Sequence, residues 1–167
     1  MTKHLFVAVT CLCAILLTGG WQGKTQTTNS GKAVLEAYVS AWNRHDFAAL
    51  DKLVTPDAVH EDIAWPSRDE GAAQIKKFMR EMIEIEPDFD WRLTTIVDGG
   101  SVLAAEWTWT ATFTGDSPVG HVVNRRVSGR GVSVAVIENG RIKRFSDYYD
   151  FASFFRNPLA DSPRTNK

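Results

Sequence analysis

The sequence predicts an α+β domain in which N-terminal helices pack on one face of an antiparallel sheet. Apolar residues recur at helical spacing up to residue 84, whereas apolar and polar residues alternate, as in strands, from residue 90 onward. The dipeptide Asn139-Gly140 between two alternating runs is a strong signal for a tight hairpin turn. Helices followed by strands that short turns connect are typical of this fold class.

Composition limits the classes of partner. The chain has 167 residues, of which 44% are hydrophobic and 23% charged, which suits one domain with appendages. A formal net charge of -1 gives no electrostatic basis for binding nucleic acid or an anionic membrane surface. Six Trp and nine Phe residues supply apolar surface for a core.

The first 23 residues have the layout of a secretory signal peptide. A short basic start at Lys3 and His4 precedes an apolar run over 5–17 and then small residues. We therefore expect export to the periplasm or the cell exterior, with an uncleaved membrane tether as the alternative. Both cysteines lie inside the apolar run, so the exported protein would contain no disulfide.

A flexible lead-in is predicted at 24–31. The domain is predicted at 32–156, and it begins with helices. Ser30 can cap a helix that ends near Trp42, and Asp46 can cap a short second helix. A short strand is predicted over 58–64. The segment 67–71 then leads into a third helix over 72–84.

The remaining elements are predicted as strands with one helical turn. They are strands at 90–97, 101–113, 122–138 and 141–150, a loop between the second and third, a helical turn at 152–155 and a polar tail at 157–167.

The long strand at 101–113 has two different faces. Trp107 and Trp109 point one way, and Glu106 and Thr108 point the other. If the helices cover the Glu106 face, that acid lies in a cavity and the two Trp residues form an exposed surface suited to a homodimer. If the helices cover the Trp face, Glu106 faces solvent. Periodicity alone does not choose between these arrangements.

Two short patterns could carry chemistry. On the last strand Asp147 shares a face with Phe145 and Tyr149, an unusual place for an acid unless it functions there. His60 and Asp62, two residues apart on the short strand, also share a face. They either lie on a solvated edge strand or point into the same pocket as Asp147, where neighbouring acids would have divergent pKa values.

Metal and nucleophile chemistry find little support in the sequence. The chain has no HxH or HExxH pattern near His60, and no Ser lies in a nucleophile elbow. We therefore expect neither a metal nor a cofactor.

Four segments resemble the nuclear transport factor two-like superfamily, and within it the SnoaL-like polyketide cyclase group. They are AYVSAWNRHDFAALDKLVTPDAVHEDIA, GAAQIKKFMREM, LAAEWTWTATFTG and VIENGRIKRFSDYYD. Limonene epoxide hydrolase and ketosteroid isomerase are related proteins. The resemblance implies a cone of helices over a curved antiparallel sheet, and it covers roughly residues 33–155.

The resemblance also implies roles for particular residues. Asp147 matches the acid/base aspartate of the last strand, and His60 and Asp62 match the two water-positioning residues of the epoxide hydrolase. The central arginine and catalytic aspartate of that enzyme fall on Glu106 and Thr108, so its catalytic triad is absent. The same comparison implies that Glu106 points inward and that Trp107 and Trp109 point outward.

The predicted function is cofactor-free acid/base chemistry, of the cyclase or isomerase type, on an apolar molecule with a carbonyl group. Asp147 would move the proton, His60 and Asp62 would orient the carbonyl or a water, and Glu106 would tune the charge. The alternative is an exported protein of the same fold that binds a small molecule without converting it. The expected pocket wall comprises Tyr38, Trp42, Trp65, Phe78, Met82 and Tyr149.

Overall fold

Four helices and six strands make up residues 30–156, the part of the chain that the computed structural model describes. The helices are α1 (Gly31–Asn43), α2 (Phe47–Leu53), α3 (Gly71–Ile85) and α4 (Phe151–Arg156). The strands are β1 (Val54–Asp62), β2 (Ser67–Glu70), β3 (Asp90–Asp98), β4 (Val102–Ser117), β5 (Gly120–Glu138) and β6 (Arg141–Tyr149). The signal peptide predicted at 1–23 and the tail predicted at 157–167 lie outside the described residues.

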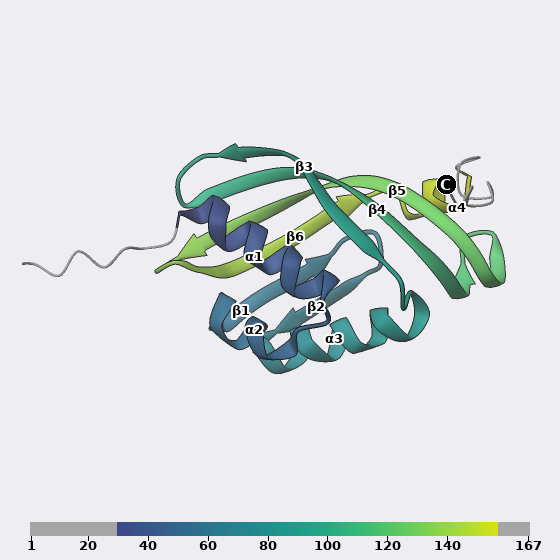
Figure 1. The fold of residues 1–167 in the computed structure, drawn as a ribbon, viewed down its shortest axis with the longest axis horizontal. Helices are drawn as coiled ribbons and strands as arrows, with labels where there is room; N and C mark the ends of the chain where they lie inside the picture. Colours follow the sequence, from purple (N-terminus) through teal and green to yellow (C-terminus); the bar gives the residue numbers. More distant parts are fainter. Residues whose placement is uncertain (1–29, 157–167) are drawn as a thin grey trace, which may run out of the picture.

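The strands form one curved sheet in the order β2-β1-β6-β5-β4-β3. All neighbours are antiparallel except β1 and β6, which run parallel, so the sheet is mixed rather than purely antiparallel. The long strands β4 and β5 bend over α1 and α3, and α4 lies near the opposite end of the sheet from the start of α1 (Figure 1). This is the predicted α+β cone fold.

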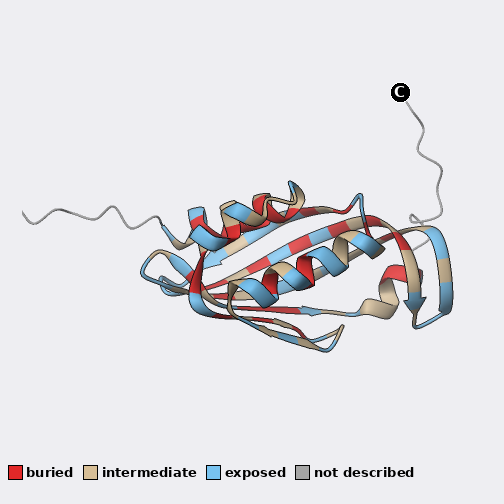
Figure 2. Cartoon of the chain, turned by 90° about the horizontal axis from the view of Figure 1, so that it is seen from below, coloured by how far each residue is buried: buried red, intermediate tan, exposed pale blue. Residues whose placement is uncertain are grey.

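The helices begin where the sequence predicted. The Ser30 side chain accepts a hydrogen bond from the amide of Ala33, and the Asp46 side chain accepts one from the amide of Ala49. Such caps satisfy amides that the first helical turn leaves unpaired. The buried residues of α1 and α3 lie along one side of each helix, facing the sheet (Figure 2).

The hairpin at Asn139 and Gly140 joins the last two strands. Both residues have positive φ, 50° and 71°, as a tight two-residue turn requires. A register shift between Val136 and Ile137 then moves the pairing by one residue, so that Ser133 of β5 lies opposite Asp147 of β6. On the other side of β6, parallel pairing aligns Asp147 with Asp62 of β1. The turn and the register shift that follows it therefore help to bring polar residues of three strands together.

Some element boundaries differ from the predictions. Strand β1 begins at Val54, before Pro56, because a register shift between Val54 and Val59 accommodates the proline within the pairing with β6. Strand β2 was not predicted, and it forms because 67–70 folds back along 59–62. Strand β4 continues past Phe113, through an irregularity near Gly115, to Ser117.

The predicted orientation of the long strand is wrong. Trp107 and Trp109 are buried, at 4% and 9% exposure, whereas Glu106 and Thr108 are exposed on the opposite face. Burying two indole rings removes far more apolar surface from water than burying a carboxylate would, and a buried carboxylate also needs a partner. The two Trp residues therefore form no exposed face, and the homodimer surface predicted from them is not present.

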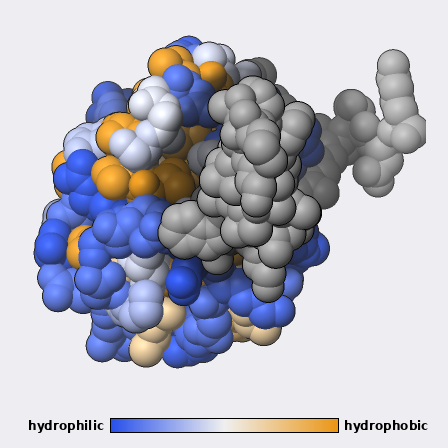
Figure 3. Space-filling model, turned by 90° about the vertical axis from the view of Figure 1, so that its left-hand side faces the viewer, coloured by the Kyte–Doolittle hydropathy of each residue, from blue (hydrophilic) through white to orange (hydrophobic). Residues whose placement is uncertain are grey.

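The surface that Figure 3 shows does not identify a binding partner. Figure 3 shows the end of the domain at which α1 begins, where hydrophilic residues cover most of the face outside the grey atoms. Within residues 30–156, no helix is long and apolar enough to cross a membrane. Export and dimer formation stay predictions.

Candidate functional site

A cavity of about 60 Å³ lies between the sheet and helices α1, α3 and α4. Of the predicted wall residues, five line it: Trp42, Trp65, Phe78, Met82 and Tyr149. Tyr38 does not, because it is fully buried in the core, where its ring packs 4.9 Å from that of Phe145. The other aromatic side chains of the wall are Trp91, Trp107, Trp109, Phe113, Phe151 and Phe154.

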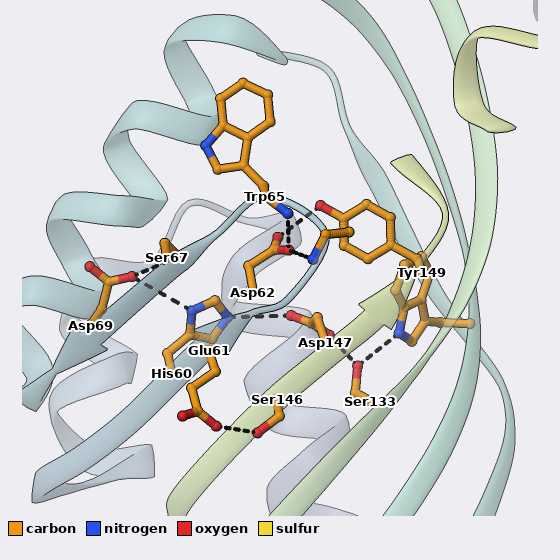
Figure 4. Close-up of polar contacts among 12 residues, drawn as sticks. His60, Glu61, Asp62, Trp65, Ser67, Asp69, Ser133, Ser146, Asp147 and Tyr149 are labelled. Atoms are coloured by element: carbon orange, nitrogen blue, oxygen red, sulfur yellow. Dashed lines mark hydrogen bonds and ion pairs between the residues drawn. The ribbon is translucent and has the colours of Figure 1, made fainter. Parts of the chain in front are cut away.

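Strands β1 and β6 bring His60 and Asp147 together. Their parallel pairing places Asp62 beside Asp147 and His60 beside Phe145, on the face that the helices cover. His60 Nε2 lies 3.3 Å from Asp147 Oδ2 (Figure 4). His60, Asp62 and Asp147 all line the cavity, as the sequence predicted.

The His60 ring lies among aromatic rings and carboxylates. It stacks on Phe145 and Trp42, at centroid distances of 5.9 Å in both cases, and is 2% exposed. Burial alone would lower the pKa of His60, but the carboxylates of Asp147 and Asp69 outweigh burial and raise that pKa to about 9. His60 is therefore a cation at neutral pH, paired with Asp147.

The second oxygen of Asp147 ends a short chain of hydrogen bonds. Ser133 on β5 donates its hydroxyl proton to Asp147 Oδ1, and Trp107 Nε1 donates to Ser133 Oγ at 2.7 Å. These donors fix the plane of the carboxylate (Figure 4). The sequence did not identify Ser133, because one serine in an alternating valine strand carries no signal for a role.

Asp62 has only neutral hydrogen-bond donors. Its Oδ1 accepts from the amides of Ala64 and Trp65, and its Oδ2 accepts from the Tyr149 hydroxyl at 2.8 Å. Burial raises the pKa of Asp62 to about 6, although the Trp65 amide and the Tyr149 hydroxyl partly oppose that increase. Asp62 can therefore exchange a proton just below neutral pH.

Glu86, which the sequence analysis did not single out, is a third acid of the cavity. It is the C-cap of α3, is 2% exposed, and accepts a 2.8 Å hydrogen bond from Trp109 Nε1. Burial raises the pKa of Glu86 to about 7, and nearby Asp88 and Asp62 add to the increase. An acid at a helix C-terminus, where the helix dipole disfavours it, was the available signal.

Glu106 does not belong to the site. It lies on the exposed face of β4, away from the cavity, so its predicted role in tuning the charge there is wrong. The inward positions of that strand are Trp107 and Trp109. Glu106 and Thr108 therefore do not occupy the inward positions that the resemblance to the epoxide hydrolase implied for them.

Three polar atoms of the cavity-lining residues lack hydrogen-bond partners. Trp42 Nε1, His60 Nδ1 and Trp91 Nε1 are buried and have no hydrogen-bond partner among the described residues. The nearest carboxylate oxygen to His60 Nδ1 is Asp69 Oδ2 at 3.9 Å, beyond hydrogen-bonding distance. Within residues 30–156, no cluster of His, Cys, Asp or Glu could hold a metal ion.

Comparisons with solved structures identify the fold. An epoxide hydrolase from M. tuberculosis of the limonene epoxide hydrolase type is 24% identical, with a TM-score of 0.60 over 74% of this chain and 85% of that chain. IdmH, a candidate polyketide cyclase from Streptomyces antibioticus, is 17% identical, with a TM-score of 0.65 over 75% and 95%. A candidate SnoaL-like polyketide cyclase from Shewanella denitrificans is 17% identical, with a TM-score of 0.66 over 78% and 97%.

Sequence comparison identifies the family. No curated protein matches the chain significantly. The sequence model of the SnoaL-like domain, in contrast, matches residues 35–145, more than half of the chain. The matched span contains most of α1, the wall residues from Trp42 to Phe113 and the His60 strand, and it ends two residues before Asp147. The chain therefore belongs to the SnoaL-like domain family, and it has the fold of nuclear transport factor two-like proteins.

Proposed function

We propose that this protein is an enzyme that transfers protons next to the carbonyl group of a small molecule, without a cofactor. The observation that carries this proposal is the convergence of His60, Asp62 and Asp147 in one aromatic cavity. Removal from water strengthens interactions between charges, and a cavity that collects perturbed acids and bases is a common site of catalysis.

Asp147 is the proposed base. It accepts a proton from the carbon next to the carbonyl, and the electron pair of that C–H bond forms the double bond of an enolate. His60 and Ser133 hold the carboxylate in place through its two oxygens. In a substrate with a neighbouring C=C bond the enolate is a dienolate, and return of the proton from Asp147 to its far carbon gives an isomer. Alternatively, the enolate carbon attacks a second carbonyl of the substrate, which closes a ring, and the resulting alkoxide takes the proton from Asp147.

Asp62 is the proposed acid, and Trp91 supports it. With a pKa of about 6, Asp62 can give its proton to the oxygen on which negative charge develops. The unpartnered Trp91 Nε1 can donate a hydrogen bond to the same oxygen. A buried donor without a partner is costly, so a ligand oxygen would satisfy it.

The cavity favours a small substrate. One buried water needs about 10–15 Å³, so about 60 Å³ corresponds to roughly four to six non-hydrogen atoms. A ring system of the size of a polyketide requires the wall to open. The partly exposed side chains Trp65, Met82 and Phe151, on three different segments, form the part of the wall at which it could open.

Deuterium exchange tests the proposal without knowledge of the natural substrate. Small ketones such as butanone and cyclopentanone exchange their α-protons in D₂O when a base abstracts them, and NMR measures the rate. We expect acceleration by the wild-type protein and a loss of about 10²–10⁴-fold in Asp147→Asn, the usual contribution of a positioned acid or base.

Glu106→Gln is the matched control, because it removes an exposed acid from the outer face and should leave the rate unchanged. A wild-type protein that binds these ketones without exchanging their protons would contradict the proposal and favour the binding protein described above.

A further inference from the structure

The cavity contains more acid than base. Among the described residues, His60 is its one basic side chain, Asp62, Glu86 and Asp147 supply three carboxyl groups, and no Lys or Arg lines the wall. His60 lies against Asp147, so its charge is already compensated. Asp62 and Glu86 are left with neutral hydrogen-bond donors only.

Of these two acids, Glu86 accepts fewer hydrogen bonds than Asp62. Its carboxylate accepts a hydrogen bond from the Trp109 indole, and the charged groups that act on it, Asp88 and Asp62, are also acids. A buried carboxylate is stable only with compensating charge or hydrogen bonds. Arg126 pairs with Asp88 but does not line the cavity, so among the described residues no positive charge lies in the wall at this end.

The same cavity has a wall suited to an organic cation. Ten of its sixteen lining residues are aromatic, and five of these are tryptophans. The negative face of an indole attracts a cation within about 6 Å, more strongly than Tyr or Phe does. Phe89 stacks on Trp109 at 4.6 Å, which holds that ring beside Glu86.

We infer that the ligand of this cavity carries a small alkylammonium group, held between Glu86 and the tryptophans of the wall. The inference names the substrate class of the site to which proton transfer is assigned above, and rests on that proposal for turnover. An amine carrying a carbonyl group would use both ends of the cavity: Trp91 and Asp62 at its oxygen, and Glu86 at its nitrogen.

A pair of probes with the same shape isolates the charge. Tetramethylammonium and tert-butanol each have five non-hydrogen atoms around a tetrahedral centre, within the size that the cavity allows. Five of the six tryptophans of the chain line the cavity, so quenching of intrinsic fluorescence reports binding. The titrations are made at constant ionic strength, with sodium chloride replacing the probe salt in the reference.

We expect the wild-type protein to bind tetramethylammonium at least about tenfold more tightly than tert-butanol. Glu86→Gln should weaken tetramethylammonium binding about tenfold and leave tert-butanol binding unchanged, which also shows that the variant keeps its cavity. Glu106→Gln, an exposed acid outside the cavity, should change neither.

Equal or weaker binding of the cation by the wild-type protein would overturn the inference, as would an unchanged cation affinity in Glu86→Gln. Neither result affects ketone exchange, which depends on Asp147. Conversely, cation binding without ketone exchange would leave the binding inference standing and remove the proposed reaction.

Discussion

Asp147 and Glu86 face the same cavity but have different partners. Asp147 has a cation, His60 at 3.3 Å, and the hydroxyl of Ser133. Glu86 is also buried, but among the described residues its carboxylate accepts a hydrogen bond only from the Trp109 indole, and burial, together with the nearby acids Asp88 and Asp62, raises its pKa to about 7. One end of the cavity is thus a completed ion pair, and the other is an acid that needs a proton or a ligand to neutralise it.

The largest effect on stability is expected from His60→Leu. Removing one partner of a buried ion pair leaves the other charge uncompensated, which costs about 3–5 kcal/mol of unfolding free energy. Because the pKa of His60 is raised from 6.5 to about 9, its stabilising contribution is complete below pH 6.5 and is lost as the pH rises through 9. Urea unfolding should therefore show a large difference in unfolding free energy between the wild type and His60→Leu at pH 6, and a small difference at pH 10.

A double variant separates charge from packing. If the cost of His60→Leu comes from the unpaired Asp147 carboxylate, then Asp147→Asn in the same chain should recover much of it. Additive losses in the double variant would show that the ring packing of His60 against Phe145 and Trp42, rather than the ion pair, carries the stability.

At the Glu86 end of the cavity, we expect a substitution to increase the unfolding free energy rather than to lower it. Glu86→Gln keeps an acceptor for the Trp109 indole but removes the ionisation. The pKa of Glu86 is raised from 4.5 to about 7, so its carboxylate destabilises the fold progressively between those pH values. The variant should be more stable than the wild type by roughly 3 kcal/mol at pH 8, with no such gain at pH 4.5.

Denaturant unfolding at the two pH values measures this difference. A gain of equal size at pH 4.5 and pH 8 would show that the glutamate is unfavourable for its shape rather than its charge, and the contrast with Asp147 would disappear.

The two ends also differ in how far the sequence predicted them. Asp147 was found because Asn139-Gly140 predicts a hairpin, and alternation along its second strand places that acid on the face of Phe145 and Tyr149. His60 and Asp62 followed from the same alternation. Glu86 lies between a helix and a strand, where no period applies, and its position depends on how α3 ends against β4.

The orientation of the long strand β4 is a feature that sequence patterns alone do not predict. Alternation separates Glu106 and Thr108 from Trp107 and Trp109, but it does not say which set the helices cover. That choice depends on the area that the whole core buries, which favours the indoles. Ser133 was missed for a related reason, because its role arises only through the register that places it beside Asp147.

The smallest expected effect concerns Asp62, which resembles Glu86 in having neutral donors only. In Tyr149→Phe, Asp62 loses the hydroxyl that stabilises its charged form, so its pKa should rise from about 6 by roughly one unit. If protonated Asp62 is the acid, ketone exchange by the wild type falls above pH 6, and in the variant the fall should begin about one unit higher. At pH 7.5 the variant should then exchange severalfold faster than the wild type, an increase that simple loss of packing would not produce. A pH–rate profile in which the falling limb stays in place would assign that limb to another group and leave Asp62 with a positioning role.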